Sequence, residues 1–324
     1  MIISKTPMRI SFFGGGTDYP AWFTEHGGAV LSTTIDKYTY ISARYLPPFF
    51  EHKYRVVWSR IENVNTIDEI NHPAVRACLH YLKFTEGVVI NHDGDLPAQS
   101  GMGTSSSFTV GLLHALHALR GKPNYPRSNV ILANEAIYVE QNLIKNYVGN
   151  QDQIAVAIGG LNLIRFNKNW QAERILLPDN ELEKRLMLVF TGLSRNSYEI
   201  ATSYQFDKAA VLSRMYDLVF LAEKALHKSQ WEDFGLMLDE SWNLKCQLSP
   251  GVCTPYIGYL YEKAKLAGAI GGKLLGAGGG GFLLILCEPD KQQAVKDALK
   301  GLLFVPFHFE DKGTQIIGDG LAGR

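Results

Sequence analysis

"LPAQSGMGTSSSFTVGLLHALHALRG", residues 96–121, places two glycines and four consecutive hydroxyl side chains directly before an amphipathic run. Apolar residues recur at three- and four-residue steps from Phe108 to Leu119, which predicts a helix that ends at Gly121. The first turn of a helix has unpaired N–H groups and about half a positive charge, so it attracts anions. Two interpretations follow: a phosphate-binding loop, or a flexible turn whose Ser and Thr side chains are ordinary N-caps.

The composition is that of a globular protein with room for one large domain or two ordinary ones. The chain has 324 residues, of which 46% are hydrophobic and 20% charged, and its formal net charge is zero. A neutral chain gives no reason to expect nucleic acid or a membrane surface as a partner, and no apolar run approaches the roughly 18–20 residues that span a bilayer. Charged residues interrupt "MIISKTPMRISFF", residues 1–13, where an export signal needs an apolar segment, so we expect a cytoplasmic protein.

The order of the patterns along the chain predicts an α+β protein. The first hundred residues are rich in β-branched and aromatic residues and indicate mainly strands. Helical patterns occupy residues 128–147 and most of the stretch from 199 to 268, and the tail indicates a strand, a helix and a strand. Strands first, helices in the middle and a mixed ending are typical of this class.

A second glycine-rich stretch, "GAGGGG" at residues 276–281, formally matches the dinucleotide-binding pattern GxGxxG. That pattern must open a helix after a strand, whereas these glycines lead into "FLLILCEP", which is typical of a strand. We therefore expect a tight turn packed against another glycine-rich loop. No GxxxxGK[ST] occurs in the chain, so it is not a P-loop protein.

Two further stretches carry one charged residue each in a suggestive place. "TPMRISFFGGGTDYP", residues 6–20, combines a strand that contains Arg9 with a glycine turn ending in Thr17 and Asp18; the alternative is a hairpin with an exposed arginine. "YVGNQDQIAVAIGG", residues 147–160, places Asp152 in a loop after the second helix, where an aspartate alone is usually a turn former.

Taken together and in this order, the four stretches resemble the GHMP small-molecule kinases, a family that includes galactokinase, homoserine kinase, mevalonate kinase and phosphomevalonate kinase. The family's three motifs are matched by "PMRISFFGGGTD", "PAQSGMGTSS" and "GAGGGG", and its catalytic-loop pattern by "GNQDQ". The run "FFGGGTDYP" and the stretch "GGKLLGAGGGGFLLI" resemble the branch of the family that acts on D-glycero-D-manno-heptose 7-phosphate, with fucokinase-type domains next.

The resemblance implies a two-domain α+β fold. Residues 1–180 would form the N-terminal ATP-binding domain of a GHMP kinase, with a fold like that of ribosomal protein S5. Residues 181–324 would form the C-terminal domain, with a ferredoxin-like core.

The resemblance also implies ATP and Mg²⁺ as cofactors, with the phosphates of ATP on the loop 101–107. Ser105 and Glu140 would be Mg²⁺ ligands, because a hydroxyl, a carboxylate and phosphate oxygens suit this cation. The alternative for Glu140 is a solvated helix carboxylate. The expected phosphate contacts come from Gly101, Gly103, Thr104, Ser105 and Ser106, and the third-motif loop contributes Gly276, Ala277, Gly278 and Gly279 to the site.

Two residues match the catalytic positions of the family. Asp152 would accept the proton of the attacking hydroxyl, or hold that hydroxyl in line with the γ-phosphate of ATP. Arg9 would lie beside it and neutralise charge on the phosphoryl group. Thr17 and Asp18 stand where the sugar kinases bind ring hydroxyls.

The implied reaction is phosphorylation of the anomeric hydroxyl of D-glycero-D-manno-heptose 7-phosphate to the 1,7-bisphosphate, for the synthesis of nucleotide-heptoses used in surface polysaccharides. The distal phosphate of this acceptor requires Arg or Lys, and the candidates are Lys37, Arg44 and Arg195, each of which is equally well a surface charge. The alternatives are a kinase for a free sugar such as fucose or galactose, and a non-catalytic sugar-sensing relative. The expected partners are a small-molecule sugar phosphate and ATP, and the protein is expected to be a monomer or a dimer.

Overall fold

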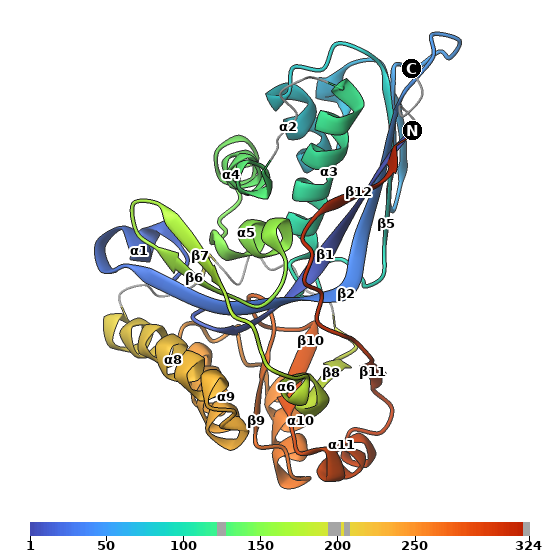
Figure 1. Ribbon diagram of the computed structural model, residues 1–324. Helices are drawn as coiled ribbons and strands as arrows, with labels where there is room; N and C mark the ends of the chain where they lie inside the picture. Colours follow the sequence, from blue (N-terminus) through green and yellow to red (C-terminus); the bar gives the residue numbers. More distant parts are fainter. Residues whose placement is uncertain (122–127, 194–201, 204–207, 320–324) are drawn as a thin grey trace.

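The computed structural model describes residues 1–121, 128–193, 202–203 and 208–319, which form two β-sheets with helices packed against each (Figure 1). The first sheet has the order β12-β1-β2-β5-β3-β4, with β6 paired to β2 and β7 to β6. β3 and β5 are parallel, and the other pairs of this sheet are antiparallel. Its strands are β1 (Ile2–Phe13), β2 (Gly28–Tyr45), β3 (Tyr54–Val57), β4 (Ile61–Val64), β5 (Val88–Gly94), β6 (Asn162–Phe166), β7 (Trp170–Arg174) and β12 (Gln315–Asp319).

Helices cover one face of the first sheet, and α3 packs directly on β1 and β2. The apolar stripe of α3 is buried there, and the helix ends where Gly121 adopts a left-handed φ of 59°, as the sequence predicts. The helices of this part are α1 (Pro20–His26), α2 (Pro73–Tyr81), α3 (Thr104–Arg120), α4 (Asn129–Tyr138) and α5 (Gln151–Ile158), with the short turns η1 (Ile67–Glu69) and η2 (Val139–Leu143).

The second sheet is antiparallel with the order β11-β8-β10-β9, and it also carries helices. Its strands are β8 (Leu186–Phe190), β9 (Gly271–Leu274), β10 (Phe282–Leu286) and β11 (Leu303–Val305). The helices are α6 (Glu181–Arg185), α8 (Ala209–His227), α9 (Trp231–Cys246), α10 (Pro255–Leu266) and α11 (Gln292–Ala298), with the turn η3 (Pro289–Lys291). None of the helices that the structure describes combines the length with the apolarity that a membrane span requires.

The two parts share a continuous apolar core, which fixes their relative position. Phe12 of β1 makes an edge-to-face contact with Phe234 of α9, with ring centroids 5.6 Å apart, and Phe282 of β10 belongs to the same buried cluster. The α+β architecture expected from the sequence is confirmed. The expected boundary after residue 180 separates the two sheets except for β12, which returns to pair with β1.

Three local elements differ from the sequence expectations. Helix α2 lies within the stretch that indicated strands; Pro73 in its first turn and the ring of His72, which accepts from the Val75 N–H, are its start signals. The helix expected over 128–147 changes to a π-helix over Val139–Leu143. Asp152 lies in the first turn of α5 and not in a loop.

Candidate active site

All four glycine- and hydroxyl-rich stretches of the sequence meet at one cavity of 570 Å³. Both sheets contribute to its wall, because the third-motif loop between β9 and β10 reaches the start of α3. A concave site that collects polar groups from distant segments is the usual form of a small-molecule site. The lining residues that the sequence singled out are Arg9, Asp18, Gly101, Gly103, Thr104, Ser105, Ser106, Glu140, Asp152, Gly276 and Ala277.

The two glycine-rich loops interlock at this cavity. Gly101 and Gly276 have left-handed φ values of 80° and 71°, and a Cβ on either one would clash with the backbone of the other loop. The Phe282 N–H donates to the carbonyl of Ser100 at 3.2 Å. The expectation that 276–281 is a turn packed on another glycine loop is confirmed. Behind the turn, Gly278 packs against Val252, whose carbonyl accepts from the Gly279 N–H at 2.9 Å, so these two glycines position the loop from outside the cavity.

The start of α3 is free of side-chain caps. Its N-cap is Gly103, with a left-handed φ of 71° and no side-chain cap hydrogen bond, so the interpretation of the Ser and Thr residues as ordinary N-caps is wrong. Thr104, Ser105 and Ser106 instead occupy the first turn, where their N–H groups lack intrahelical acceptors. This helix end faces the cavity and suits an anion.

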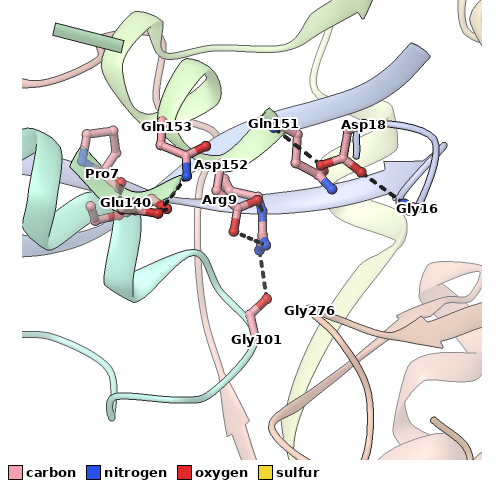
Figure 2. Close-up of polar contacts among 12 residues, drawn as sticks. Pro7, Arg9, Gly16, Asp18, Gly101, Glu140, Gln151, Asp152, Gln153 and Gly276 are labelled. Carbon is pink, nitrogen blue, oxygen red and sulfur yellow. Dashed lines mark hydrogen bonds and ion pairs between the residues drawn. The ribbon is translucent and has the colours of Figure 1, made fainter. Parts of the chain in front are cut away.

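Arg9 and Asp152 form a bidentate ion pair in the cavity wall (Figure 2). Arg9 Nε donates to Oδ1 and Nη2 to Oδ2 of Asp152, both at 2.7 Å, while Nη1 donates to the carbonyl of Gly101 at 2.7 Å. The arginine is 3% exposed, which excludes the alternative of an exposed hairpin arginine. The Asp152 side chain is 25% exposed and therefore reachable from the cavity. The guanidinium thus joins the glycine loop to the carboxylate.

Glu140 lies in the π-helix that follows α4, a type of distortion that is frequent at functional sites. It is 1% exposed, so the alternative of a solvated helix carboxylate is wrong. Its Oε2 accepts from Gln153 Nε2 at 2.6 Å and from Ser106 Oγ at 3.1 Å, and its buried Oε1 has no hydrogen-bond partner. Burial raises the pKa of this carboxyl to about 7. A buried carboxylate oxygen without a partner beside a hydroxyl is a pair of donors that suits a hard cation.

The hydroxyl that touches Glu140 belongs to Ser106 and not to Ser105. Ser105 is exposed and lines the cavity one residue earlier in the same turn. Both hydroxyls therefore remain candidate cation ligands, and Ser106 is the one that sequence comparison with the motif missed.

Replacing Glu140 with Gln should stabilise the free protein by an amount that depends on pH. The raised pKa means that the Glu140 carboxyl binds its proton more tightly in the folded state than in the unfolded state. The stability that protonated Glu140 contributes is therefore fully present below pH 4.5 and is lost as the pH rises to about 7. Glutamine cannot ionise, so the variant avoids this loss of unfolding free energy, which is about 3 kcal/mol at most. Its Tm should therefore exceed that of the wild type by a few degrees above pH 7 but not near pH 4.5.

Thermal unfolding by circular dichroism without Mg²⁺, from pH 4.5 to 8, measures this effect. Glu25→Gln, at an exposed position of α1, is the matched control and should show no such trend. A Tm difference for the Glu140 variant that does not change with pH would contradict a strained buried carboxylate.

Asp18 and Glu140 lie on opposite sides of the Arg9–Asp152 pair (Figure 2). Asp18 is 1% exposed, its Oδ1 accepts from the Gly16 N–H at 2.9 Å and its Oδ2 from the Gln151 N–H at 3.3 Å. Burial, together with the charge of Asp152, raises its pKa to about 6. The carboxylate is thus held by backbone N–H groups, with lone pairs left to accept from ligand hydroxyls.

Thr17, its neighbour, is fully buried and does not line the cavity. Its hydroxyl lies 2.8 Å from the carbonyl oxygen of Gly14 and 2.9 Å from that of Ala29. Thr17 therefore stabilises the turn, and Asp18 is the residue of the two that lines the cavity.

The structure places two of the three expected distal-phosphate cations outside the cavity. Lys37 lies in a bulge of β2 and pairs with Asp36, with Nζ 2.8 Å from Oδ1. Arg44 is exposed and lies ten positions along β2 from Thr34, the residue that pairs with Arg9 in the sheet. Ten residues of extended chain place Arg44 about 33 Å from Thr34. Arg195 lies outside the described residues.

Two buried lysines that the sequence did not single out do line the cavity. Lys245 of α9 donates to the carbonyls of Leu274 and Gly276, and Lys273 of β9 donates to the carbonyl of Phe12 at 2.8 Å. Their burial could not be predicted from the sequence, because a lysine is normally exposed. Lys273 nevertheless stands in the quoted run "GGKLLGAGGGG", three positions before the third motif.

Comparison with known proteins gives one consistent family. GHMP kinases N terminal domain matches residues 69–160 and GHMP kinases C terminal matches residues 222–303, together more than half of the chain. The D-glycero-alpha-D-manno-heptose 7-phosphate kinase of Campylobacter jejuni is 26% identical over 321 residues, covering 92% of this chain and 93% of that protein. The bifunctional fucokinase/GDP-fucose pyrophosphorylase of Arabidopsis thaliana is 28% identical over 335 residues, covering 91% of this chain but 31% of that protein.

A solved structure agrees in fold. The crystal structure of a D-glycero-D-manno-heptose 1-phosphate kinase from Bacteroides thetaiotaomicron superposes with a TM-score of 0.80 at 22% sequence identity, covering 98% of this chain and 99% of that one. The matched family domains contain the start of α3, Glu140, Asp152 and the third-motif loop, which are the elements that surround the cavity. The chain therefore belongs to the GHMP kinases, a family of ATP-dependent phosphotransferases.

Proposed function

We propose that this enzyme transfers the γ-phosphoryl group of ATP to the anomeric hydroxyl of D-glycero-D-manno-heptose 7-phosphate, giving the 1,7-bisphosphate. The observation that carries the proposal is the buried Arg9–Asp152 pair, with both contacts at 2.7 Å, between the uncapped start of α3 and the carboxylate of Asp18. In this proposal residues 1–180 bind ATP, and residues 181–324 close the cavity on the acceptor side.

Each part of the cavity then has a role in phosphoryl transfer, which depends on positioning and charge neutralisation. The N–H groups of the first turn of α3 bind the phosphates of ATP. The acceptor oxygen attacks the γ-phosphorus, the bond to the β,γ-bridging oxygen breaks, and ADP leaves. Asp152 accepts the proton of the attacking hydroxyl through a lone pair that Arg9 does not use. Arg9 stabilises the negative charge on the moving group.

The donor set around Glu140 fits a Mg²⁺ ion, which neutralises phosphate charge when bound. The unpartnered Oε1 of Glu140 and the hydroxyls of Ser105 and Ser106 would hold it. Without the ion, the buried charge of Glu140 is compensated by hydrogen bonds from neutral side chains, those of Ser106, Thr109 and Gln153, and burial still raises its pKa.

The choice of acceptor is supported by two observations. A relative that spans nearly the whole chain bears the name of a heptose 7-phosphate kinase. Two buried lysines of the cavity wall, Lys245 and Lys273, also have no carboxylate within 4.0 Å among the described residues, which favours an anionic acceptor over a free sugar. The complete catalytic pair argues against a non-catalytic sensor.

The test is identification of the product by ³¹P and ¹H NMR after incubation with ATP, Mg²⁺ and D-glycero-D-manno-heptose 7-phosphate. We expect a second phosphate on C1, and a higher kcat/KM for this acceptor than for the unphosphorylated heptose, fucose or galactose. A free hexose as the preferred acceptor, or no consumption of ATP with any of them, would reject the proposal.

A further inference from the structure

Lys245 and Lys273 are two buried ammonium groups in the cavity wall, and the catalytic roles assigned above do not use either of them. Lys245 is 4% exposed and Lys273 2% exposed. They come from different elements of the C-terminal half, α9 and β9, and meet at the cavity. A long cationic side chain is almost never fully buried unless an anion pairs with it.

The described part of the chain supplies no such anion. Among the described residues, neither lysine has a carboxylate within 4.0 Å, and the hydrogen bonds of both go to neutral carbonyls. The nearby carboxylates are already engaged, since Asp152 accepts from two of the three guanidinium nitrogens of Arg9, and Asp18 accepts from backbone N–H groups. Among the described residues, the cavity wall therefore contains two lysine side chains without a carboxylate in direct contact.

The position of the lysines assigns them to the acceptor side. The charges that act on Lys273 are those of Lys245, Arg9 and Asp18, and those on Lys245 include Asp18 and Asp152. Asp18 thus acts on both lysines, whereas Glu140 lies on the opposite side of the Arg9–Asp152 pair in Figure 2. The lysines thus lie near Asp18, away from the donor set for the cation that accompanies ATP.

Burial makes the charged state of the lysines costly in the free enzyme. It lowers the pKa of Lys245 to about 8 and that of Lys273 well below its ordinary value, and the positive charge of Arg9 acts in the same direction. An anion entering this space compensates the buried charges and removes the cost.

We infer that Lys245 and Lys273 together bind an anionic group of the acceptor, which in the function proposed above is the distal phosphate of the sugar, and that they select phosphorylated over neutral sugars. The inference rests on the proposed function for the identity of the acceptor. The geometry that carries it is two buried lysine side chains, without ion-pair partners among the described residues, on the Asp18 side of one cavity.

The test compares Lys273→Met and Lys245→Met with the wild type on D-glycero-D-manno-heptose 7-phosphate and on the same heptose without phosphate. Methionine is an unbranched side chain only one heavy atom shorter than lysine, and it removes the charge. We expect each substitution to lower kcat/KM for the phosphorylated acceptor by about 10²-fold or more, and for the neutral heptose by a clearly smaller factor. Lys224→Met, at an exposed position of α8, is the matched control and should change neither value.

The possible outcomes separate the two proposals. If the wild type prefers neutral sugars, the proposed function fails. If the wild type prefers heptose 7-phosphate but the lysine variants lose both acceptors by the same factor, the inference about the lysines fails alone.

A measurement on the wild-type protein does not depend on whether the variants fold. Sulfate, a dianion that does not titrate near neutrality, is added at pH 8 in two buffers of different ionisation enthalpy, and the proton uptake is obtained by calorimetry. We expect sulfate to bind with uptake of a proton, because an anion raises the pKa of a neighbouring lysine. Binding without proton uptake, or no binding, would overturn the inference. The other charged or titratable groups that interact with Lys245 in this measurement are Arg9, Asp18, Asp152, Cys246 and Lys273.

Discussion

Asp152→Asn should lower kcat by about 10²–10⁴-fold, the range that a positioned acid–base group contributes. Asparagine has nearly the same shape but cannot accept the proton, and it leaves the guanidinium of Arg9 without its ion-pair partner. Because the substitution leaves the start of α3, the proposed phosphate site, unchanged, KM for ATP should change little. Steady-state kinetics at saturating ATP and acceptor measure both values.

The control for this variant is Asp36→Asn, which removes a carboxylate of β2 that pairs with Lys37 outside the cavity. It should keep the wild-type kcat. If Asp152→Asn also kept it, with Tm showing that both proteins are folded, Asp152 would have no part in the transfer step, and the mechanism proposed above would be wrong.

Gly101→Ala should reduce kcat/KM for ATP by about 10²-fold or more. The new Cβ would clash with the carbonyl of Leu275, and the residue has a left-handed φ of 80° that alanine adopts at a cost. The two glycine loops must then separate, which displaces the start of α3 and the carbonyl that accepts from Arg9. A displacement of about 1 Å between reacting groups is enough for a loss of this size.

Gly121→Ala is the matched control, because Gly121 also has a left-handed φ, 59°, but has open space where the Cβ would lie. It should cost about 1 kcal/mol of stability at most and leave the kinetics unchanged. Equal kinetic losses in the two variants would show that backbone strain, and not contact between the loops, accounts for the effect.

The sequence predicted the parts of the site that depend on order along the chain. The four motifs, the helix after Gly103 and the turn at 276–281 were recognisable because glycine spacing and apolar periodicity are local properties. The placement of Asp152 in a loop was wrong, because two flanking glutamines do not reveal that a helix begins at Gln151.

The parts that depend on burial could not be predicted in the same way. Glu140 faces the cavity from a π-helix, which has no sequence signature, so its unpartnered oxygen appears only in three dimensions. Lys37 and Arg44 were natural candidates for a phosphate ligand by charge alone, whereas Lys245 and Lys273 are brought to the cavity by the packing of the C-terminal half.

The most direct test of the account is a crystal structure with Mg²⁺, a non-hydrolysable ATP analogue and D-glycero-D-manno-heptose 7-phosphate. We expect the β- and γ-phosphates against the N–H groups of Thr104, Ser105 and Ser106, and the anomeric oxygen within hydrogen-bonding distance of Asp152. A nucleotide bound elsewhere, with Asp152 remote from both ligands, would contradict it.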